Sequence, residues 1–315
     1  MKKYMQSAYK PKQNIMLILY AFIAANISLI FISSAQAQNT SASDVYRNTE
    51  EMRMEVAAFH EADFTTIPET GASETPIVLY RHVLQKARLV FQRVQWLRYI
   101  NGLPVKDIPA FPVRNITPTD VKHLLDDILS ELQELRSNYG IEAVFPVSRP
   151  ASASPSEIYL SLNSVEVALN SLGIPELSMN ELYQLSNTIT SDLEKIRTTE
   201  GIVTPVKNAK NATNKSLTDA YDEAFNLLTK LKMLTQTPGY DIPGGVLLPV
   251  KLSSGSVSSA DLATALNHII AELGAIKQTV DAKSPTEFSP LESGKTPTDV
   301  YNSLVEAQSI VNTLL

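Results

Sequence analysis

The chain has 315 residues, 44% of them hydrophobic, and its 27 Lys and Arg against 33 Asp and Glu give a formal net charge of −6 at pH 7. This apolar content is enough to bury a large core, and the acidic charge argues against binding nucleic acid through the overall field. The absence of cysteine excludes disulfides, thiolate metal sites and covalently attached c-type haem.

The N-terminus has the layout of a signal peptide. An uncharged apolar run over residues 15–32 is followed by the small-residue cleavage site Ala35-Gln36-Ala37. We therefore expect residues 1–37 to be removed and the protein to be periplasmic or secreted. The alternative is an N-terminal membrane anchor, because the run is nearly long enough to span a bilayer as a helix. The basic residues before the run are Lys2, Lys3, Lys10 and Lys12.

Four segments share one order: Ser or Thr, two further residues, Asp or Glu, an aliphatic residue and Tyr. The hydroxyl accepts a hydrogen bond from a free N–H at a helix start, and the acid reaches back to the cap residue near the positive end of the helix dipole. Each copy therefore predicts a helix start. The copies begin at Ser41, Ser154, Ser216 and Thr296, and a degenerate fifth copy at Thr75 lacks the acid.

A second class of helix start lies between these copies. It has an aliphatic residue before the cap, which is the pattern of a hydrophobic staple, and no Tyr. Its three caps are Thr117, Ser178 and Ser258. Apolar residues at helical spacing follow every start. We predict eight helices, over residues 43–61, 75–101, 118–138, 155–172, 179–199, 217–236, 259–280 and 297–315.

The predicted fold class is all-α, with repeated antiparallel helix pairs forming a helical bundle or a short irregular solenoid. Pro-Val phrases, as in Phe111-Pro-Val and Leu248-Pro-Val, predict extended and ordered connectors between the helices. The predicted division is a signal peptide at 1–37, a lone helix at 38–71, three helical repeat units at 72–150, 151–211 and 212–294, and a lone helix at 295–315. The lone terminal helices suggest assembly into homo-oligomers.

Signals for catalysis or cofactor binding are few. The four histidines lie on four predicted helices, and the one close group, His60, Glu61 and Asp63, lacks the spacing that places two ligands on one helix face. No nucleophile elbow, phosphate loop or dinucleotide fingerprint occurs. We predict no metal, no cofactor and no enzyme activity, although a pair of carboxylates brought together by folding would leave no local pattern.

The tyrosines of the helix starts have two interpretations. Either each ring packs in the core and directs its hydroxyl at a loop, or the rings form a row of stacking platforms for a ligand. The recurrence at one helical position favours the core. The tyrosines considered for ligand stacking are Tyr80, Tyr159, Tyr221 and Tyr301.

The second predicted helix concentrates basic charge and contains no acid. One interpretation is that it lies against acidic faces of its neighbours; the other is that it forms a docking face for an anionic partner. Trp96 and Tyr99 of the same helix suit a binding edge, although Trp96 fits the core better. The basic residues considered for partner binding are Arg81, Lys86, Arg88, Arg93 and Arg98.

These patterns predict a non-catalytic binding or scaffolding protein for another cell-envelope component, which is an envelope protein or an anionic polymer or lipid surface. The alternative is a periplasmic receptor or sensor for a small ligand, with a pocket inside a helix bundle lined by Arg88, Arg93 or the repeated tyrosines.

Overall fold

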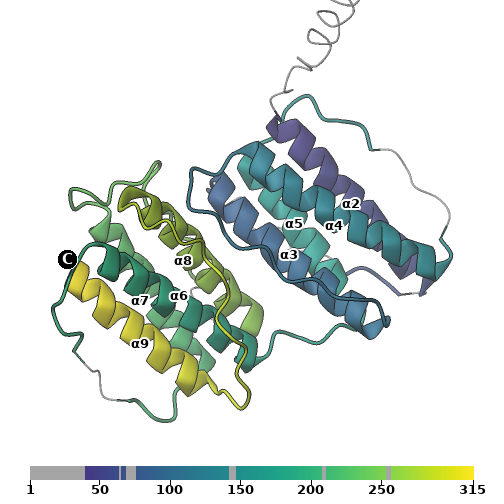
Figure 1. Ribbon diagram of the computed structural model, residues 1–315. Coiled ribbons are helices and arrows are strands. Elements are labelled where there is room, and N and C mark those ends of the chain that lie inside the picture. Colours follow the sequence, from purple (N-terminus) through teal and green to yellow (C-terminus); the bar gives the residue numbers. More distant parts are fainter. Residues whose placement is uncertain (1–39, 64, 69–75, 142–146, 208–210, 253–256) are drawn as a thin grey trace, which may run out of the picture. The chain divides into compact units, whose positions relative to one another are not determined.

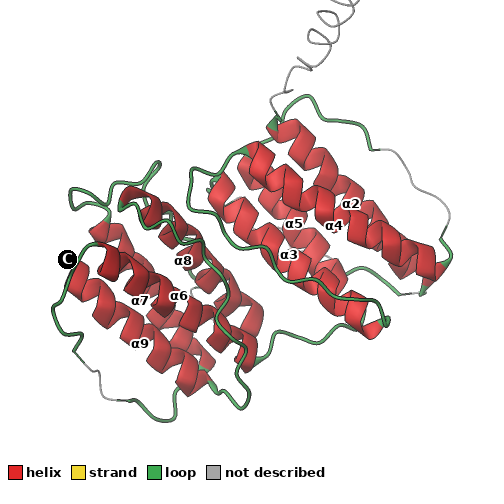
Figure 2. Cartoon of the chain, viewed as in Figure 1, coloured by secondary structure: helices red, strands yellow, loops and turns green. Residues whose placement is uncertain are grey.

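The computed structural model describes residues 40–315, except residue 64 and residues 69–75, 142–146, 208–210 and 253–256. Within this part the chain forms eight helices and no strand (Figure 2), which confirms the all-α class. None of the described helices is long and apolar enough to cross a membrane. The predicted signal peptide, residues 1–37, lies outside the described residues.

The helices are α2 (Ala42–Ala62), α3 (Tyr80–Ile100), α4 (Pro118–Tyr139), α5 (Pro155–Asn170), α6 (Met179–Thr199), α7 (Leu217–Leu234), α8 (Ser259–Thr279) and α9 (Pro297–Leu314). Their ends agree with the predictions within two residues, except at the start of α3. There the helix begins after Leu79, and the N–H of Leu79 donates to Nδ1 of His82 at 3.0 Å. His82 thus takes the place of the acid that the degenerate copy at Thr75 lacks.

The helices group into two four-helix bundles (Figure 1): bundle A contains α2–α5, and bundle B contains α6–α9. In each bundle the first helix contacts the third and fourth, and the second also contacts the third and fourth. Each bundle has its own apolar core. The predicted units pair the helices by two and leave α2 and α9 single, whereas the contacts group them by four.

Neighbouring helices within a bundle run parallel, where the sequence predicts antiparallel pairs. Along α2 and α4, Asn48 bonds to Asp126 at 2.5 Å and, further on, Phe59 packs on Tyr139 with 5.1 Å between ring centroids. In bundle B, Gln308 of α9 bonds to Glu223 of α7. Lys230, later in α7, bonds to Asn312, later in α9, at 2.9 Å. The residue numbers of both partners rise together, as parallel helices require.

Parallel packing explains the lengths of the connectors. A helix of 21 residues, such as α3, is about 32 Å long, and the chain has to return over that length before the next helix begins. The N-caps of bundle A stand at 41, 79, 117 and 154, so the helix starts recur at intervals of 38, 38 and 37 residues. The repeating unit is therefore one helix with its returning connector.

The apolar faces of the terminal helices are covered within the chain. Val56 and Phe59 of α2, and Val300 and Leu304 of α9, are fully buried in the two cores. Assembly through these helices remains a prediction, but it would have to use their outer, polar faces.

The bundles contact each other through α3 and α8, which run antiparallel. Beside them, connector 101–117 of bundle A meets connector 280–296 of bundle B, where Phe111 and Thr286 form an isolated antiparallel β-bridge. The ring of Phe111 lies on Gly274 of α8, and a Cβ at Gly274 would stand 2.5 Å from that ring. Glycine at this position therefore allows the connector to approach the helix closely.

The substitution Gly274→Ala should destabilise the fold by about 1–3 kcal/mol, because the Phe111 ring is buried and has to move. Urea denaturation followed by circular dichroism measures this cost. In a double-mutant cycle with Phe111→Ala, the double variant should be more stable than the sum of the single effects predicts. Additive effects would show that the two residues do not constrain each other.

Candidate functional site

The basic residues of α3 are buried, and acidic neighbours compensate several of their charges. Arg81 pairs with Glu272 at 2.8 Å, Lys86 pairs with Glu166, and Arg98 pairs with Glu131 at 2.7 Å. This arrangement agrees with the interpretation that the helix lies against acidic neighbours. With their charges compensated inside the chain, these side chains leave little for an external anion to bind.

The four arginines of α3 share a second role, because each donates to the carbonyl of a proline in a connector. Arg81 donates to Pro243 at 2.8 Å, Arg88 to Pro109 at 2.7 Å, and Arg98 to Pro104 at 2.8 Å. Arg93 donates in the same way to Pro175. Burial lowers the pKa of Arg88 to about 9, with Asp192 opposing that shift, so the side chain stays charged at neutral pH. α3 therefore anchors the connectors of both bundles.

A buried cluster of ionisable groups lies where α3 meets α8. Because Nδ1 of His82 accepts the N–H of Leu79, its Nε2 carries the proton and donates to Glu272 at 3.0 Å. The ring of His268 lies 4.8 Å from that of His82, and its Nε2 is 3.5 Å from the hydroxyl of Tyr159. Nδ1 of His268 has no partner among the described residues. Burial lowers the pKa of His268 well below its usual value, and the nearby positive charges of Lys86 and Arg81 lower it further.

The repeated tyrosines are dispersed rather than assembled. Tyr221 is buried, and its hydroxyl accepts the N–H of Leu252 at 3.1 Å, as expected of a core tyrosine that contacts a loop. Tyr159 is buried beside His268, and Tyr301 lies under the ammonium of Lys215 at 4.6 Å. Tyr80 borders a separate cavity of about 270 Å³ near the start of α3. Tyr159, Tyr221 and Tyr301 therefore contact other parts of the fold, while Tyr80 lines that cavity.

The predicted group around His60 is also structural. His60 is buried, with Nε2 bonded to the carbonyl of Ala168 at 2.9 Å and Nδ1 bonded to the hydroxyl of Thr65 at 2.7 Å. In the described part of the chain, no group of three His, Asp or Glu residues is placed to hold a metal ion.

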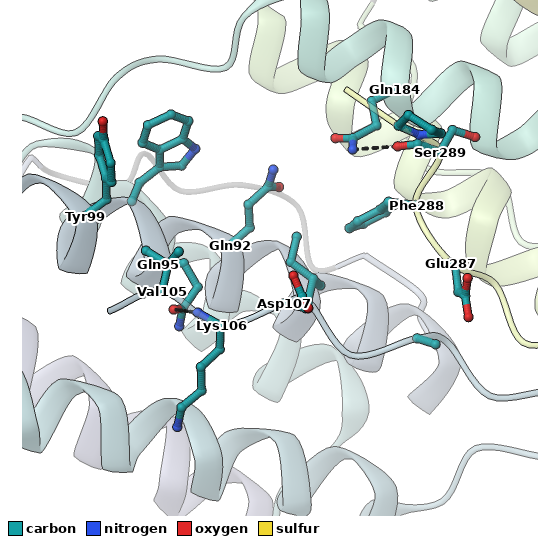
Figure 3. Close-up of a pocket in the computed structure, with 14 residues that line it drawn as sticks. Gln92, Gln95, Tyr99, Val105, Lys106, Asp107, Gln184, Glu287, Phe288 and Ser289 are labelled. Atoms are coloured by element: carbon teal, nitrogen blue, oxygen red, sulfur yellow. Dashed lines mark hydrogen bonds between the residues drawn. The ribbon is translucent and has the colours of Figure 1, made fainter. Parts of the chain in front are cut away.

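A groove of about 820 Å³ lies between α3 with connector 101–117 and α6 with connector 280–296 (Figure 3). Its volume lies in the range of ligand-binding pockets. We call it the groove throughout. Its wall in bundle A has Gln92, Gln95, Trp96, Tyr99, Val105, Lys106, Asp107, Ile108 and Ala110, and its wall in bundle B has Gln184, Glu287, Phe288, Ser289 and Pro290.

Buried hydrogen bonds hold the wall in bundle B. The hydroxyl of Thr286 donates to Asp192, which also accepts from Lys277 at 2.9 Å. Next along the connector, the N–H of Ser289 donates to Thr188 at 2.9 Å. The carbonyl of Ser289 accepts from Gln184 at 2.7 Å, a bond visible in Figure 3. These bonds fix the backbone that presents Glu287 and Phe288.

The opposite wall is held in the same way. The buried Gln95 of α3 accepts the backbone N–H of Lys106 at 2.8 Å, which ties connector 101–117 to the helix (Figure 3). Trp96 is half-buried and donates its indole N–H to Glu181 at 3.2 Å. The ring of Tyr99 stands edge-on to it at 5.7 Å and is 64% exposed. Both walls are thus formed before any ligand binds.

Trp96 and Tyr99, which were considered as a binding edge from the sequence, line the groove, but the sequence analysis missed its other half. Asp107, Glu287 and Phe288 lie in connectors, and no local pattern shows that two connectors separated by more than 150 residues meet. Asp107 and Glu287 each lie two residues from a proline, and this pattern is typical of any loop. None of the residues considered for partner binding or ligand stacking lines the groove.

Comparisons with models of protein families, with curated proteins and with solved structures gave no match.

Folding stability should fall as the pH drops below about 6.5, because His268 binds a proton more readily in the unfolded chain than in the fold. The contribution of one such histidine approaches about 1.4 kcal/mol per pH unit. Urea denaturation between pH 5 and 8 should give a shallower slope for His268→Gln than for the wild type. The same change at the exposed His123 is the control. Equal slopes in all three proteins would contradict the assignment to His268.

Proposed function

We propose that the protein is an exported, non-catalytic binding protein that holds a component of the cell envelope in the groove. The observation that carries the proposal is a preformed groove of about 820 Å³ whose two walls are fixed by buried side chains. Binding sites require such fixed walls, because a wall that is ordered only on binding weakens affinity. The assignment to the envelope rests on the signal-peptide pattern of residues 1–37.

A receptor for a small ligand is the second candidate, and the volume of the groove favours it. The site differs from the one expected for a receptor, because it lies between bundles rather than inside one. Arg88 and Arg93 serve the connectors instead of lining it.

The photo-crosslinking amino acid p-benzoylphenylalanine in place of Tyr99 should capture the partner in cells, because this ring is exposed at the groove. The same amino acid at Met233, which is 53% exposed on α7, is the control position. Mass spectrometry of the adducts should show a product specific to position 99.

A groove-filling variant tests the same site by blocking it. The substitution Ala110→Trp places a large ring in the groove and should abolish the adduct at position 99, whereas Ala260→Trp at an exposed position on α8 should leave it. An adduct that survives Ala110→Trp would place the binding surface elsewhere. A stoichiometric small molecule found by native mass spectrometry, and lost in Ala110→Trp, would establish the receptor.

Export predicts that the protein isolated from the envelope fraction lacks its first 37 residues. Intact-mass measurement of the protein from that fraction checks this directly. Replacing Ala35 and Ala37 by Arg should block cleavage, because the peptidase site needs small residues. An unprocessed wild-type chain in the membrane fraction would favour the N-terminal anchor.

A further inference from the structure

The groove has unpaired negative charge. Three charged residues line it, and one of them, Lys106, is already paired with the buried carboxylate of Glu131. The other two, Asp107 and Glu287, are exposed and have no ionic or hydrogen-bonding partner in the described part of the chain. They lie on opposite walls (Figure 3), so a ligand in the groove meets a carboxylate on each side.

Several polar groups of the groove are free acceptors. The indole N–H of Trp96 and one amide N–H each of Gln92 and Gln184 donate to Glu181 or Ser289. The amide oxygens of both glutamines accept no hydrogen bond from the described residues. The unpaired nitrogen of Gln95 is buried. A ligand that supplies N–H or O–H donors can pair with these oxygens and with the two carboxylates, while each of the two glutamine nitrogens keeps one further N–H.

The aromatic residues of the groove suit a cation. Tyr99 is 64% exposed, and a ring face attracts Lys or Arg through its quadrupole. The protein already uses this contact internally, because the guanidinium of Arg88 lies 4.4 Å from the centroid of the Phe288 ring, which also borders the groove. Free carboxylates, free acceptors and exposed rings together favour a positively charged ligand rather than an anionic or neutral one.

We propose that the groove binds a basic segment of a protein partner, with Lys or Arg side chains placed between Asp107 and Glu287 and against Tyr99. This inference rests on the proposed function. A segment fits better than a small amine, because a volume of about 820 Å³ exceeds that of one side chain. Asp107, Tyr99 and Glu287 are all exposed, so an extended chain can enter and leave the groove. The proposed partner is opposite in charge to the anionic surface considered from the sequence.

The test uses fluorescence anisotropy of two labelled peptides with the purified protein. Tetra-arginine is the basic probe, and tetra-citrulline has nearly the same shape without the charge. We expect tetra-arginine to bind saturably and at least tenfold more tightly than tetra-citrulline, because two charge-assisted contacts are lost in the second peptide. Equal affinities, or no saturable binding of tetra-arginine, would overturn the proposal.

Two double variants separate the groove from the general acidity of the protein. Asp107→Asn with Glu287→Gln should weaken tetra-arginine binding about tenfold. Asp127→Asn with Glu306→Gln changes the net charge equally at exposed positions outside the groove, and should leave affinity unchanged. Tyr99→Ala should weaken binding about two- to fivefold. Equal losses in both double variants would show attraction by net charge alone and would overturn the proposal.

The two kinds of variant also separate two hypotheses: that the groove binds a partner, and that this partner is basic. If Ala110→Trp abolishes the adduct at position 99 but the groove double variant retains it, the binding function stands and the basic partner is wrong. Displacement of the tetra-arginine probe by the neutral sugar tetra-N-acetylchitotetraose, with no difference between the two double variants, would identify a sugar ligand instead.

Discussion

The parallel direction of the helices within each bundle is the constraint on which the other features depend. Antiparallel neighbours need only short turns, whereas parallel neighbours need connectors that run back along the bundle. Such connectors carry backbone carbonyls that have to be hydrogen-bonded where they are covered. The arginines of α3 meet this need, because a guanidinium can donate to a carbonyl and pair with a carboxylate at once. Arg98 does both, through Pro104 and Glu131.

The same constraint produces the groove. Connectors 101–117 and 280–296 both pass beside the contact of α3 with α8, and the bridge between Phe111 and Thr286 joins them there. Past this bridge the two backbones diverge and line opposite walls of one depression. The connectors rather than the helices therefore present the free carboxylates and the Phe288 ring, while the helices contribute Trp96, Tyr99 and the glutamine amides.

Local patterns were sufficient to predict the helices but not their packing. A capping box is complete within four residues, so Ser216 with Asp219 marks the start of α7 wherever that helix lies. The start of α3 was predicted wrongly because a histidine replaces the acid. An apolar stripe specifies that one face is buried, but it does not specify the direction of the neighbouring helix. The regular interval of the N-caps was the available signal, since an interval near 38 residues leaves room for one helix and its return.

α3 and the connectors have different roles: α3 holds the connector backbones in place, and the connectors present the side chains that a ligand would contact. Burying charges such as Arg88 and Lys86 costs free energy that a well-packed apolar helix would avoid. An apolar α3 would, however, leave the carbonyls of Pro109 and the other anchored prolines unpaired, and the connectors free to shift. The buried charges therefore affect the groove by fixing the position of the connectors that form its walls. Asp107 and Glu287 make no side-chain hydrogen bond or ion pair with the described residues, and an exposed carboxylate on a rigidly held backbone is well placed to meet a ligand without reorganisation.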